Sequence, residues 1–210
     1  MNKIVTRPLS DIYMHVSSGK KYYPFAPKPE DVCIDVIAHH LATRARWNGA
    51  TQHKMNEDLI FYSVAEHSVY VSEYVEYVLQ RPDLAMEALL HDASEAYNGD
   101  LIRPLKYSAE FAEPFRKVED INEKAIAKKF NLPWPMSPEV KIGDEAVCNA
   151  EFEQIIPRSP EQDWSLGTMH DTENTAQNEI QMLLPKQARD FFMGRFWSVL
   201  KLHGRTGKSA

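Results

Sequence analysis

Apolar residues recur at steps of three or four along most of the chain, which is the spacing of a single helix face. The positions Ile60, Val64, Val71 and Val75 show this spacing clearly. No alternating pattern typical of strands accompanies it, so the predicted fold class is all-α, a helical bundle around one core. We expect helices from about Asp31, over Asp58–Leu79, over Asp83–Tyr97, over residues 109–130, from about Pro138 and from about Pro185.

The remaining segments are predicted to lack regular structure. Residues 1–30 end in a proline-rich stretch that disfavours both helix and strand. Residues 204–210 read as a flexible tail. The length of 210 residues suits one domain, since domains commonly run to roughly 100–200 residues. We therefore expect a single domain over residues 1–203.

Composition narrows the function. The chain carries 24 Lys and Arg against 30 Asp and Glu, a net charge of −6, which disfavours binding to a nucleic-acid polymer. Its two cysteines, Cys33 and Cys148, are too far apart in sequence to form a thiolate metal motif. The N-terminus has no apolar run of signal-peptide type, and no segment is long and apolar enough for a membrane span. We expect a cytoplasmic protein with no membrane contact.

Four ionisable side chains fall on the apolar faces of three predicted helices: His67, the pair His91 and Asp92, and Asp144. A single buried His or Asp is more often a satisfied structural group. Four of them on core faces favour another explanation, because unpaired buried charge costs several kcal/mol. One shared divalent ion would offset that cost. Two imidazoles and two carboxylates suit Mn²⁺, Co²⁺, Fe²⁺ or Zn²⁺ and leave positions open for water and substrate.

The segments FYSVAEHS, ALLHDASEAYNGDLIRPLK and VKIGD resemble the HD-domain phosphohydrolase superfamily, whose metal signature is H…HD…D. The resemblance is closest to its 5′-deoxynucleotidase-like branch and to similar small phage and prophage proteins. It implies a metal site in the core of the bundle, with His67, His91, Asp92 and Asp144 as ligands of a divalent ion (Mn, Co, Fe, Zn or Mg). Relatives of this size often form dimers or higher oligomers, so a homo-oligomer is expected.

The resemblance also implies two catalytic carboxylates. Glu95 lies one helical turn beyond His91 and Asp92, where it could handle the proton of the attacking water or of the leaving oxygen. Asp100 follows the helix end and in similar enzymes lies near the sugar hydroxyl and the attacking water. The alternatives are a solvated carboxylate for Glu95 and a turn cap for Asp100.

Substrate contacts are implied for Arg46 and Trp47, which match an Arg-aromatic pair of the family. Arg offers a planar fork for phosphate oxygens, and Trp can stack on a base. Lys106 could neutralise phosphate, and Arg103 could do the same. The alternatives are surface cations and a Trp that anchors the core.

Two histidine positions stay open. Prophage relatives carry a His shortly after the Arg-aromatic pair, where this chain has Asn48, and the nearest candidate to replace it is His53. His39 and His40 are adjacent on the first predicted helix, and a structural role is favoured for both.

The sequence therefore predicts a metal-dependent phosphohydrolase of small nucleotides. The leading hypothesis is a 5′-deoxynucleotidase that converts deoxynucleoside monophosphates to deoxynucleoside and phosphate. The alternative within enzymes is a phage-type dNTP triphosphohydrolase, for example one acting on dATP, because the basic residues Arg103, Lys106, Arg116 and Lys117 permit a longer phosphate chain. Cleavage of another phosphoester, such as a cyclic nucleotide, is a third. The alternative of another class is a non-catalytic nucleotide-binding module.

Overall fold

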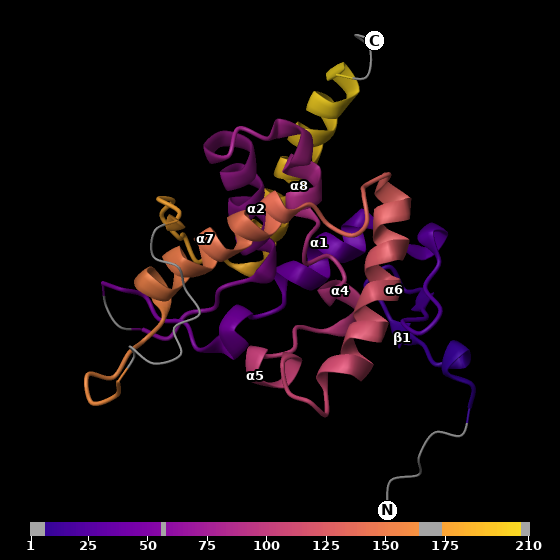
Figure 1. The fold of residues 1–210 in the computed structure, drawn as a ribbon, viewed down its shortest axis with the longest axis horizontal. Helices are drawn as coiled ribbons and strands as arrows, with labels where there is room; N and C mark the ends of the chain where they lie inside the picture. The colour runs from indigo at the N-terminus through magenta and orange to yellow at the C-terminus, as the bar shows by residue number, and fades with distance from the viewer. Residues whose placement is uncertain (1–6, 56–57, 164–173, 207–210) are drawn as a thin grey trace, which may run out of the picture.

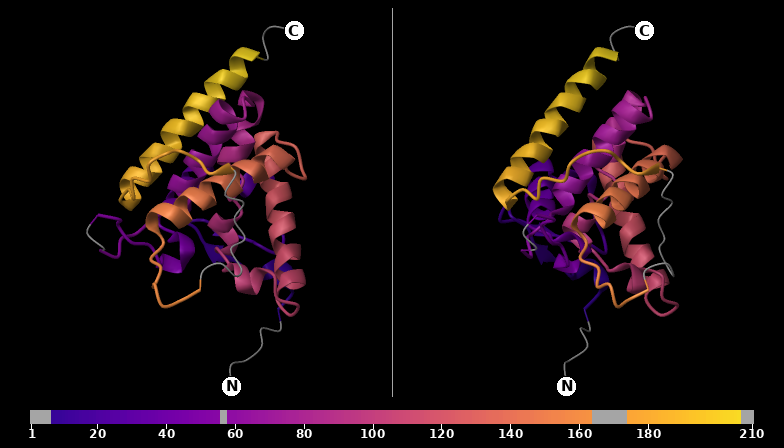
Figure 2. Two further views of the ribbon diagram at one scale, coloured as in Figure 1. Left: turned by 60° about the vertical axis from the view of Figure 1, so that its left-hand side comes forward. Right: turned by 90° about the vertical axis from the view of Figure 1, so that its left-hand side faces the viewer.

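The computed structural model describes residues 7–55, 58–163 and 174–206. These residues form a helical bundle, which confirms the predicted all-α fold class (Figures 1 and 2). The described part of the chain contains eight α-helices. They are α1 (Ile34–Ala42), α2 (Val64–Glu73), α3 (Ala85–Leu89), α4 (Glu95–Asn98), α5 (Arg103–Lys106), α6 (Ala112–Phe130), α7 (Pro138–Ile155) and α8 (Pro185–Thr206).

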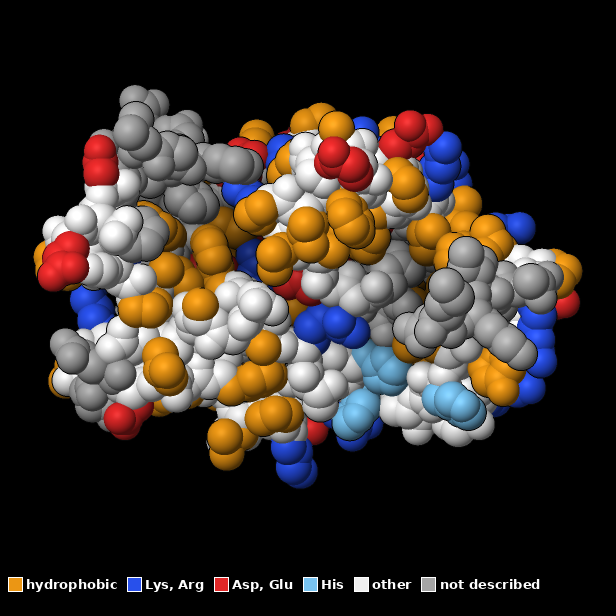
Figure 3. Space-filling model, turned by 90° about the horizontal axis from the view of Figure 1, so that it is seen from below, with side chains coloured by type: hydrophobic (Ala, Val, Ile, Leu, Met, Phe, Trp, Pro, Cys, Tyr) orange, Lys and Arg blue, Asp and Glu red, His pale blue; other side chains and the backbone are white. Residues whose placement is uncertain are grey.

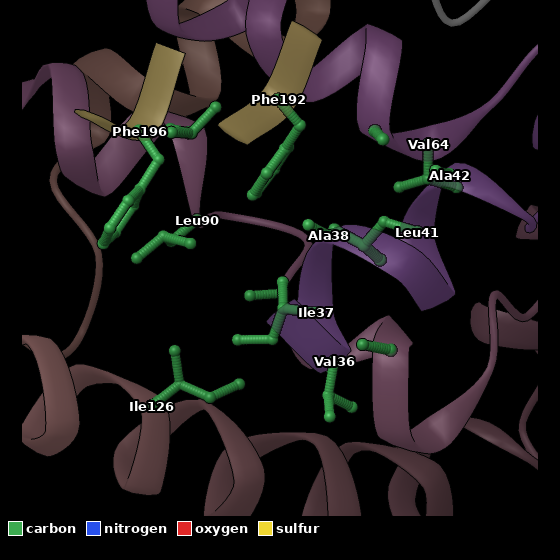
Figure 4. Close-up of a cluster of buried hydrophobic side chains, with 14 of the residues drawn as sticks. Val36, Ile37, Ala38, Leu41, Ala42, Val64, Leu90, Ile126, Phe192 and Phe196 are labelled. Atoms are coloured by element: carbon green, nitrogen blue, oxygen red, sulfur yellow. The ribbon is translucent and has the colours of Figure 1, made fainter. Parts of the chain in front are cut away.

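Helix α2 lies at the centre of the bundle, where it contacts α1, α3, α7 and α8. Every residue from Val64 to Ser72 is buried, so this helix has no solvent face over that span. Side chains of α1, α2, α6 and α8 converge in the main core beside it, among them Ile37, Leu41, Phe192 and Phe196 (Figure 4). A polar side chain on α2 is therefore held inside the molecule and must find its partners there.

Helix α2 is shorter than the predicted helix Asp58–Leu79. It begins at Val64, and the Ser63 side chain caps it by accepting a 3.1 Å hydrogen bond from the Glu66 amide. The residues before it pair with another loop instead, through bridges between Ala45 and Ser63 and between Gln52 and Leu59. A π-helical turn, Tyr74–Val78, follows the helix. The prediction failed at the N-terminal end of this helix because the backbone groups of the residues before Val64 bond to the neighbouring loop through these bridges.

The predicted continuous helix Asp83–Tyr97 is also wrong. A 3₁₀ turn, Pro82–Leu84, leads into α3, which ends at Leu89, and α4 begins only at Glu95. Between them the backbone tightens into turns with three-residue hydrogen bonds, such as Ala93 N–H to Leu90 O at 3.0 Å. This break lies at His91 and Asp92, and it changes how both side chains are presented.

Other boundaries follow the sequence more closely. Helices α7 and α8 begin at the predicted prolines, which suit the first turn of a helix. Helix α6 begins at Ala112 rather than near residue 109, and the short α5 was not predicted.

The two ends of the chain differ from their predictions in part. Helix α8 runs to Thr206, so the predicted tail is helical in its first three residues, and residues 207–210 lie outside the described residues. Residues 1–6 of the predicted irregular segment lie outside them too.

That N-terminal segment contains a small sheet that was not predicted. Strands β1 (Met14–His15) and β2 (Lys21–Tyr22) pair antiparallel. The buried Tyr22 hydroxyl donates to Asn122 of α6 at 2.8 Å, which fastens the sheet to the bundle. Among the described helices, each is too short or too polar to cross a bilayer.

Candidate metal centre and substrate cavity

Two histidines in the core, His67 and His91, direct their Nε2 atoms at one point, because the Nδ1 atom of each is held by a neighbouring oxygen. His67 Nδ1 lies 2.5 Å from a Glu151 oxygen, and His91 Nδ1 lies 2.8 Å from the Ala88 carbonyl oxygen. A carbonyl or carboxylate oxygen only accepts, so each Nδ1 is the donor. The two Nε2 atoms are therefore the ring atoms left to bind a metal, and they face one another, 3.3 Å apart. Histidines that bind metals are commonly held in this way by a partner on the other ring nitrogen.

The break after α3 supplies the Ala88 contact. In an uninterrupted helix the Ala88 carbonyl would accept from the backbone four residues later. Here it accepts from the His91 ring, and the tightened turn lets His91 and the adjacent Asp92 reach one point. Adjacent residues on a regular helix would diverge by about 100°.

Two carboxylates complete the cluster. Asp144 Oδ1 lies 3.1 Å from His67 Nε2 and 3.8 Å from His91 Nε2, and Asp92 Oδ2 lies 3.1 Å from His91 Nε2 and 3.8 Å from His67 Nε2. Ligands at roughly 2.1 Å from one ion stand roughly 3.0–3.4 Å from their neighbours. His67, His91 and Asp144 therefore offer ligand atoms within 4.8 Å of one another, a grouping that could hold a divalent ion, and Asp92 lies beside them at the His91 ring.

The electrostatics of the cluster favour a cation. Burial alone would lower the pKa of His91, but Asp92 and Asp144 outweigh it and raise this pKa to about 9. Burial would likewise raise the pKa of Asp144, yet the two histidines and Arg46 hold it well below its usual value. The site thus stabilises positive charge between its carboxylates, which a divalent ion would supply.

Arg46 and Trp47 lie beside this cluster in a turn that is built onto the start of α2. The Arg46 amide donates to the Tyr62 carbonyl at 2.9 Å, immediately before the Ser63 cap. Trp47 adopts left-handed backbone angles, with φ of 54°. The Arg46 guanidinium lies 3.5 Å from Asp92 Oδ2, so a phosphoryl oxygen at the metal would be within its reach.

Two residues of α7 that the sequence analysis missed also contact this turn. Cys148 accepts from Arg46 Nη2 at 2.9 Å, and the fully buried Glu151 accepts from Arg46 and Trp47. They follow Asp144 by four and seven residues, which is the spacing of one helix face. That spacing was the available signal. Burial alone would raise the pKa of Glu151, but Arg46 and His67 lower it to about 2, so this carboxylate is ionised at neutral pH.

A cavity of about 640 Å³ opens beside the cluster. Asp92, Asp144, Arg46, Glu95 and Asp100 all line it, so the structure brings the two predicted carboxylate ligands and both predicted catalytic carboxylates to one space. Its size is within the range of roughly 300–1,000 Å³ that is usual for small-molecule sites.

Glu95 is 5% exposed, and its Oε2 atom has no hydrogen-bond partner among the described residues. Burial, followed by the charges of Asp92 and Asp100, raises the pKa of Glu95 well above its usual value. Burial also raises the pKa of Asp100, although Arg46 opposes it. A buried carboxyl group with a raised pKa and a free oxygen suits proton transfer near neutral pH.

Basic side chains also line the cavity. Lys106 reaches it but is held by Glu119 at 2.9 Å, while Arg103 and Arg116 line it without an ion pair among the described residues. Lys117 is not part of the lining and pairs with Glu113 on the surface.

The face of the molecule seen in Figure 3 interleaves acidic, basic and hydrophobic side chains and shows no broad area of one charge.

The histidines that were left open do not join the cluster. His53 is absent from the cavity lining, and its Nδ1 accepts from the Met55 amide. His40 links three segments, because its Nε2 accepts from the Ser17 amide at 3.1 Å and its Nδ1 lies 2.8 Å from the Ala96 carbonyl. His39 lines a neighbouring recess, which shares Asp100 with the main cavity.

The chain is similar to known proteins over much of its length. Residues 37–141 match the family described as 5′-deoxynucleotidase YfbR-like. An uncharacterized protein of Rhodobacter capsulatus is 34% identical over 151 residues, which cover 68% of this chain and 72% of the relative. The uncharacterized protein YfdR of Escherichia coli K12 is 34% identical over 132 residues, or 63% of this chain and 66% of the relative.

Proposed function

Because the chain belongs to the YfbR-like 5′-deoxynucleotidase family of HD-domain proteins, we propose that it hydrolyses deoxynucleoside monophosphates to deoxynucleoside and phosphate in a metal-dependent reaction. The observation that carries the proposal is the cluster of His67, His91 and Asp144, with Asp92 beside His91, next to Arg46 and a cavity of about 640 Å³. The family match ends at residue 141, so the assignment of Asp144 as a ligand rests on its distances to the two histidines.

The proposed roles follow from these positions. A divalent ion held by the four side chains would supply an activated water and stabilise charge on the phosphoryl oxygens. Arg46 would bind a non-bridging oxygen of the phosphate through its Nη atoms, which lie near Asp92 and Asp144. Glu95 would move the proton, and Asp100, which lines both the main cavity and the neighbouring recess, would contact the sugar. Trp47 would border the nucleotide, and Lys106 would add positive charge.

A second candidate has an observation of its own. Arg103 and Arg116 line the same cavity, and neither has an ion pair among the described residues. They could hold two further phosphates, which favours a dNTP triphosphohydrolase that cleaves at the same α-phosphate. A non-catalytic binding module is disfavoured, because the chain retains both Glu95 and Asp100.

The test is to identify the product. Purified protein is incubated with Mn²⁺, Co²⁺ or Mg²⁺ and with panels of NMPs, dNMPs and dNTPs, with Asp92→Ala prepared in parallel as the control for contaminating phosphatases. Orthophosphate from dNMPs, absent in the variant, supports the proposal. Triphosphate from dNTPs supports the second candidate instead. Metal binding without any product would contradict both.

A further inference from the structure

Glu151 lies at the junction between the metal cluster and the Arg46–Trp47 turn. It is fully buried on α7, two helical turns after Asp144 and on the same face. It does not line the cavity, so it is not placed to touch substrate. Nothing in the proposed reaction uses this carboxylate directly.

Its two oxygens are shared between the two halves of the site. Oε1 lies 2.5 Å from His67 Nδ1 and accepts from the Tyr62 hydroxyl at 2.9 Å. Oε2 accepts from Arg46 Nε at 2.9 Å and from Trp47 Nε1 at 2.7 Å. A carboxylate has about four lone-pair sites, and four donor groups occupy them here.

Each contact fixes the chemistry of its partner. The Oε1 contact makes His67 Nδ1 the donor, so Nε2 is the ring atom left to face Asp144 and His91. The Oε2 contact holds the inner edge of the Arg46 guanidinium, which leaves Nη1 and Nη2 directed toward the cluster. One anion therefore orients both a predicted metal ligand and the predicted phosphate-binding group.

We propose that Glu151 is a positioning residue that couples the metal site to the phosphate site, so that changing it weakens metal binding and substrate binding together. This inference rests on the proposed function of the same site. The predicted loss of metal affinity is measured without any substrate. It would therefore still be observed if the assigned substrate were wrong.

The chain offers a matched control in Glu66, another fully buried carboxylate. Glu66 accepts from the Tyr70 hydroxyl at 2.9 Å and from three backbone amides, of which Leu183 is the nearest at 2.7 Å. It fastens the segment before α8 and has no hydrogen bond to the cluster. Glu66→Gln thus reports the loss of stability that follows from altering a buried carboxylate outside the cluster.

The first experiment measures Mn²⁺ affinity by calorimetry on metal-stripped protein and KM for a dNMP at saturating metal. Glu151→Gln is expected to weaken Mn²⁺ binding roughly 10–100-fold, the usual effect of losing a residue that orients a ligand. It is also expected to raise KM, while Glu66→Gln lowers the melting temperature and leaves both constants unchanged. Wild-type Mn²⁺ affinity and KM in Glu151→Gln would overturn the proposal.

A double-variant cycle tests whether Glu151 acts through Arg46. The KM of the Glu151→Gln, Arg46→Ala double variant should equal that of Arg46→Ala alone, since the carboxylate then has no guanidinium to orient. Independent, additive effects on KM would contradict the coupling.

A second measurement needs no folded Glu151 variant. Nitrogen-15 NMR of the wild-type histidines, with the His67 signal assigned by its loss in His67→Asn, reports which ring nitrogen carries hydrogen. The proposal requires the Nδ1-protonated tautomer for His67, with Nε2 shifting on addition of Zn²⁺, a diamagnetic probe. Protonation at Nε2 in the metal-loaded protein would overturn it.

Discussion

His67 and His91 present their Nε2 atoms to the same point because the Nδ1 atom of each donates to a fixed acceptor. One acceptor is the Glu151 side chain, and the other is the Ala88 backbone carbonyl. The sequence allowed the two histidines to be picked out by their motif, but it did not identify these acceptors. The spacing of Glu151 from Asp144 placed it on the same face of α7, but its contacts with His67 and Arg46 become apparent only once that face is seen to pack against α2.

The role of Glu95 leads to a prediction at the same scale. Glu95→Gln keeps the shape of the side chain and removes its ability to exchange a proton, so kcat should fall roughly 10²–10⁴-fold. The Mn²⁺ affinity should stay at the wild-type value, because Glu95 is neither in the group of His67, His91 and Asp144 nor, like Asp92, in contact with its histidines. Steady-state kinetics and calorimetry measure the two effects. Turnover at the parental rate would remove Glu95 from the mechanism.

Among the elements, the long helices were predictable and the interruptions were not. Hydrophobic spacing located α6, α7 and α8, where one face meets the core over many turns. The same spacing continued from Ala85, Ala88 and Leu89 to Asp92 and Ala96, so it could not show that the backbone tightens to present His91 and Asp92. Hydrophobic periodicity indicates which residues are buried. A short turn can bury the same residues as a helix would, although its backbone hydrogen bonds differ.

The close packing of α7 on the turn after α2 gives the next prediction. A Cβ atom at Gly143 would lie 2.7 Å from Val75 Cγ2, so Gly143→Ala should destabilise the protein by about 1–3 kcal/mol. Gly194 in α8 has no atom within 4 Å of such a Cβ. Gly194→Ala should therefore stabilise by about 0.5–1 kcal/mol through helix propensity. Urea denaturation measures both, and equal changes of the same sign would contradict this packing.

Capping of α2 is testable in the same way. The Ser63 side chain satisfies the Glu66 amide at the buried start of the helix that carries His67. Ser63→Ala removes that acceptor and should cost about 1 kcal/mol, with Ser63→Asp recovering less than a surface cap would because the site is buried. An unchanged urea midpoint in Ser63→Ala would show that the cap contributes nothing to stability.

Across the whole molecule, the net charge of −6 gave no guide to the site, and the expectation that it disfavours a nucleic-acid polymer stays a prediction. Acidic groups gather at the cluster, and their repulsion is relieved by His91, Arg46 and the expected ion. Family membership supports the predicted hydrolase and its divalent metal, whereas the identity of the metal was beyond sequence because the donor set suits several ions. The predicted homo-oligomer stays a prediction. On α8, Trp197 is 49% exposed and Leu200 is 43% exposed, which leaves apolar surface for such a contact.

Metal binding should stabilise the entire fold, since the four donors come from three separate segments of the chain. Mn²⁺ at about 100 times its Kd would add about 2.7 kcal/mol, or roughly 5–10 °C in Tm for a domain of this size. Differential scanning calorimetry measures the shift. Asp144→Asn should show little of it, and an equal shift in that variant would place the ion elsewhere.

The central claim is that this cluster holds the ion on which hydrolysis depends. The most direct measurement is orthophosphate release from a dNMP by chelator-stripped protein as Mn²⁺ is added back, with Asp144→Asn alongside. We predict no release from the stripped protein, full recovery at about one ion per chain, and no recovery in the variant. Release by stripped protein at the rate of the loaded enzyme, or equal recovery in Asp144→Asn, would contradict the account.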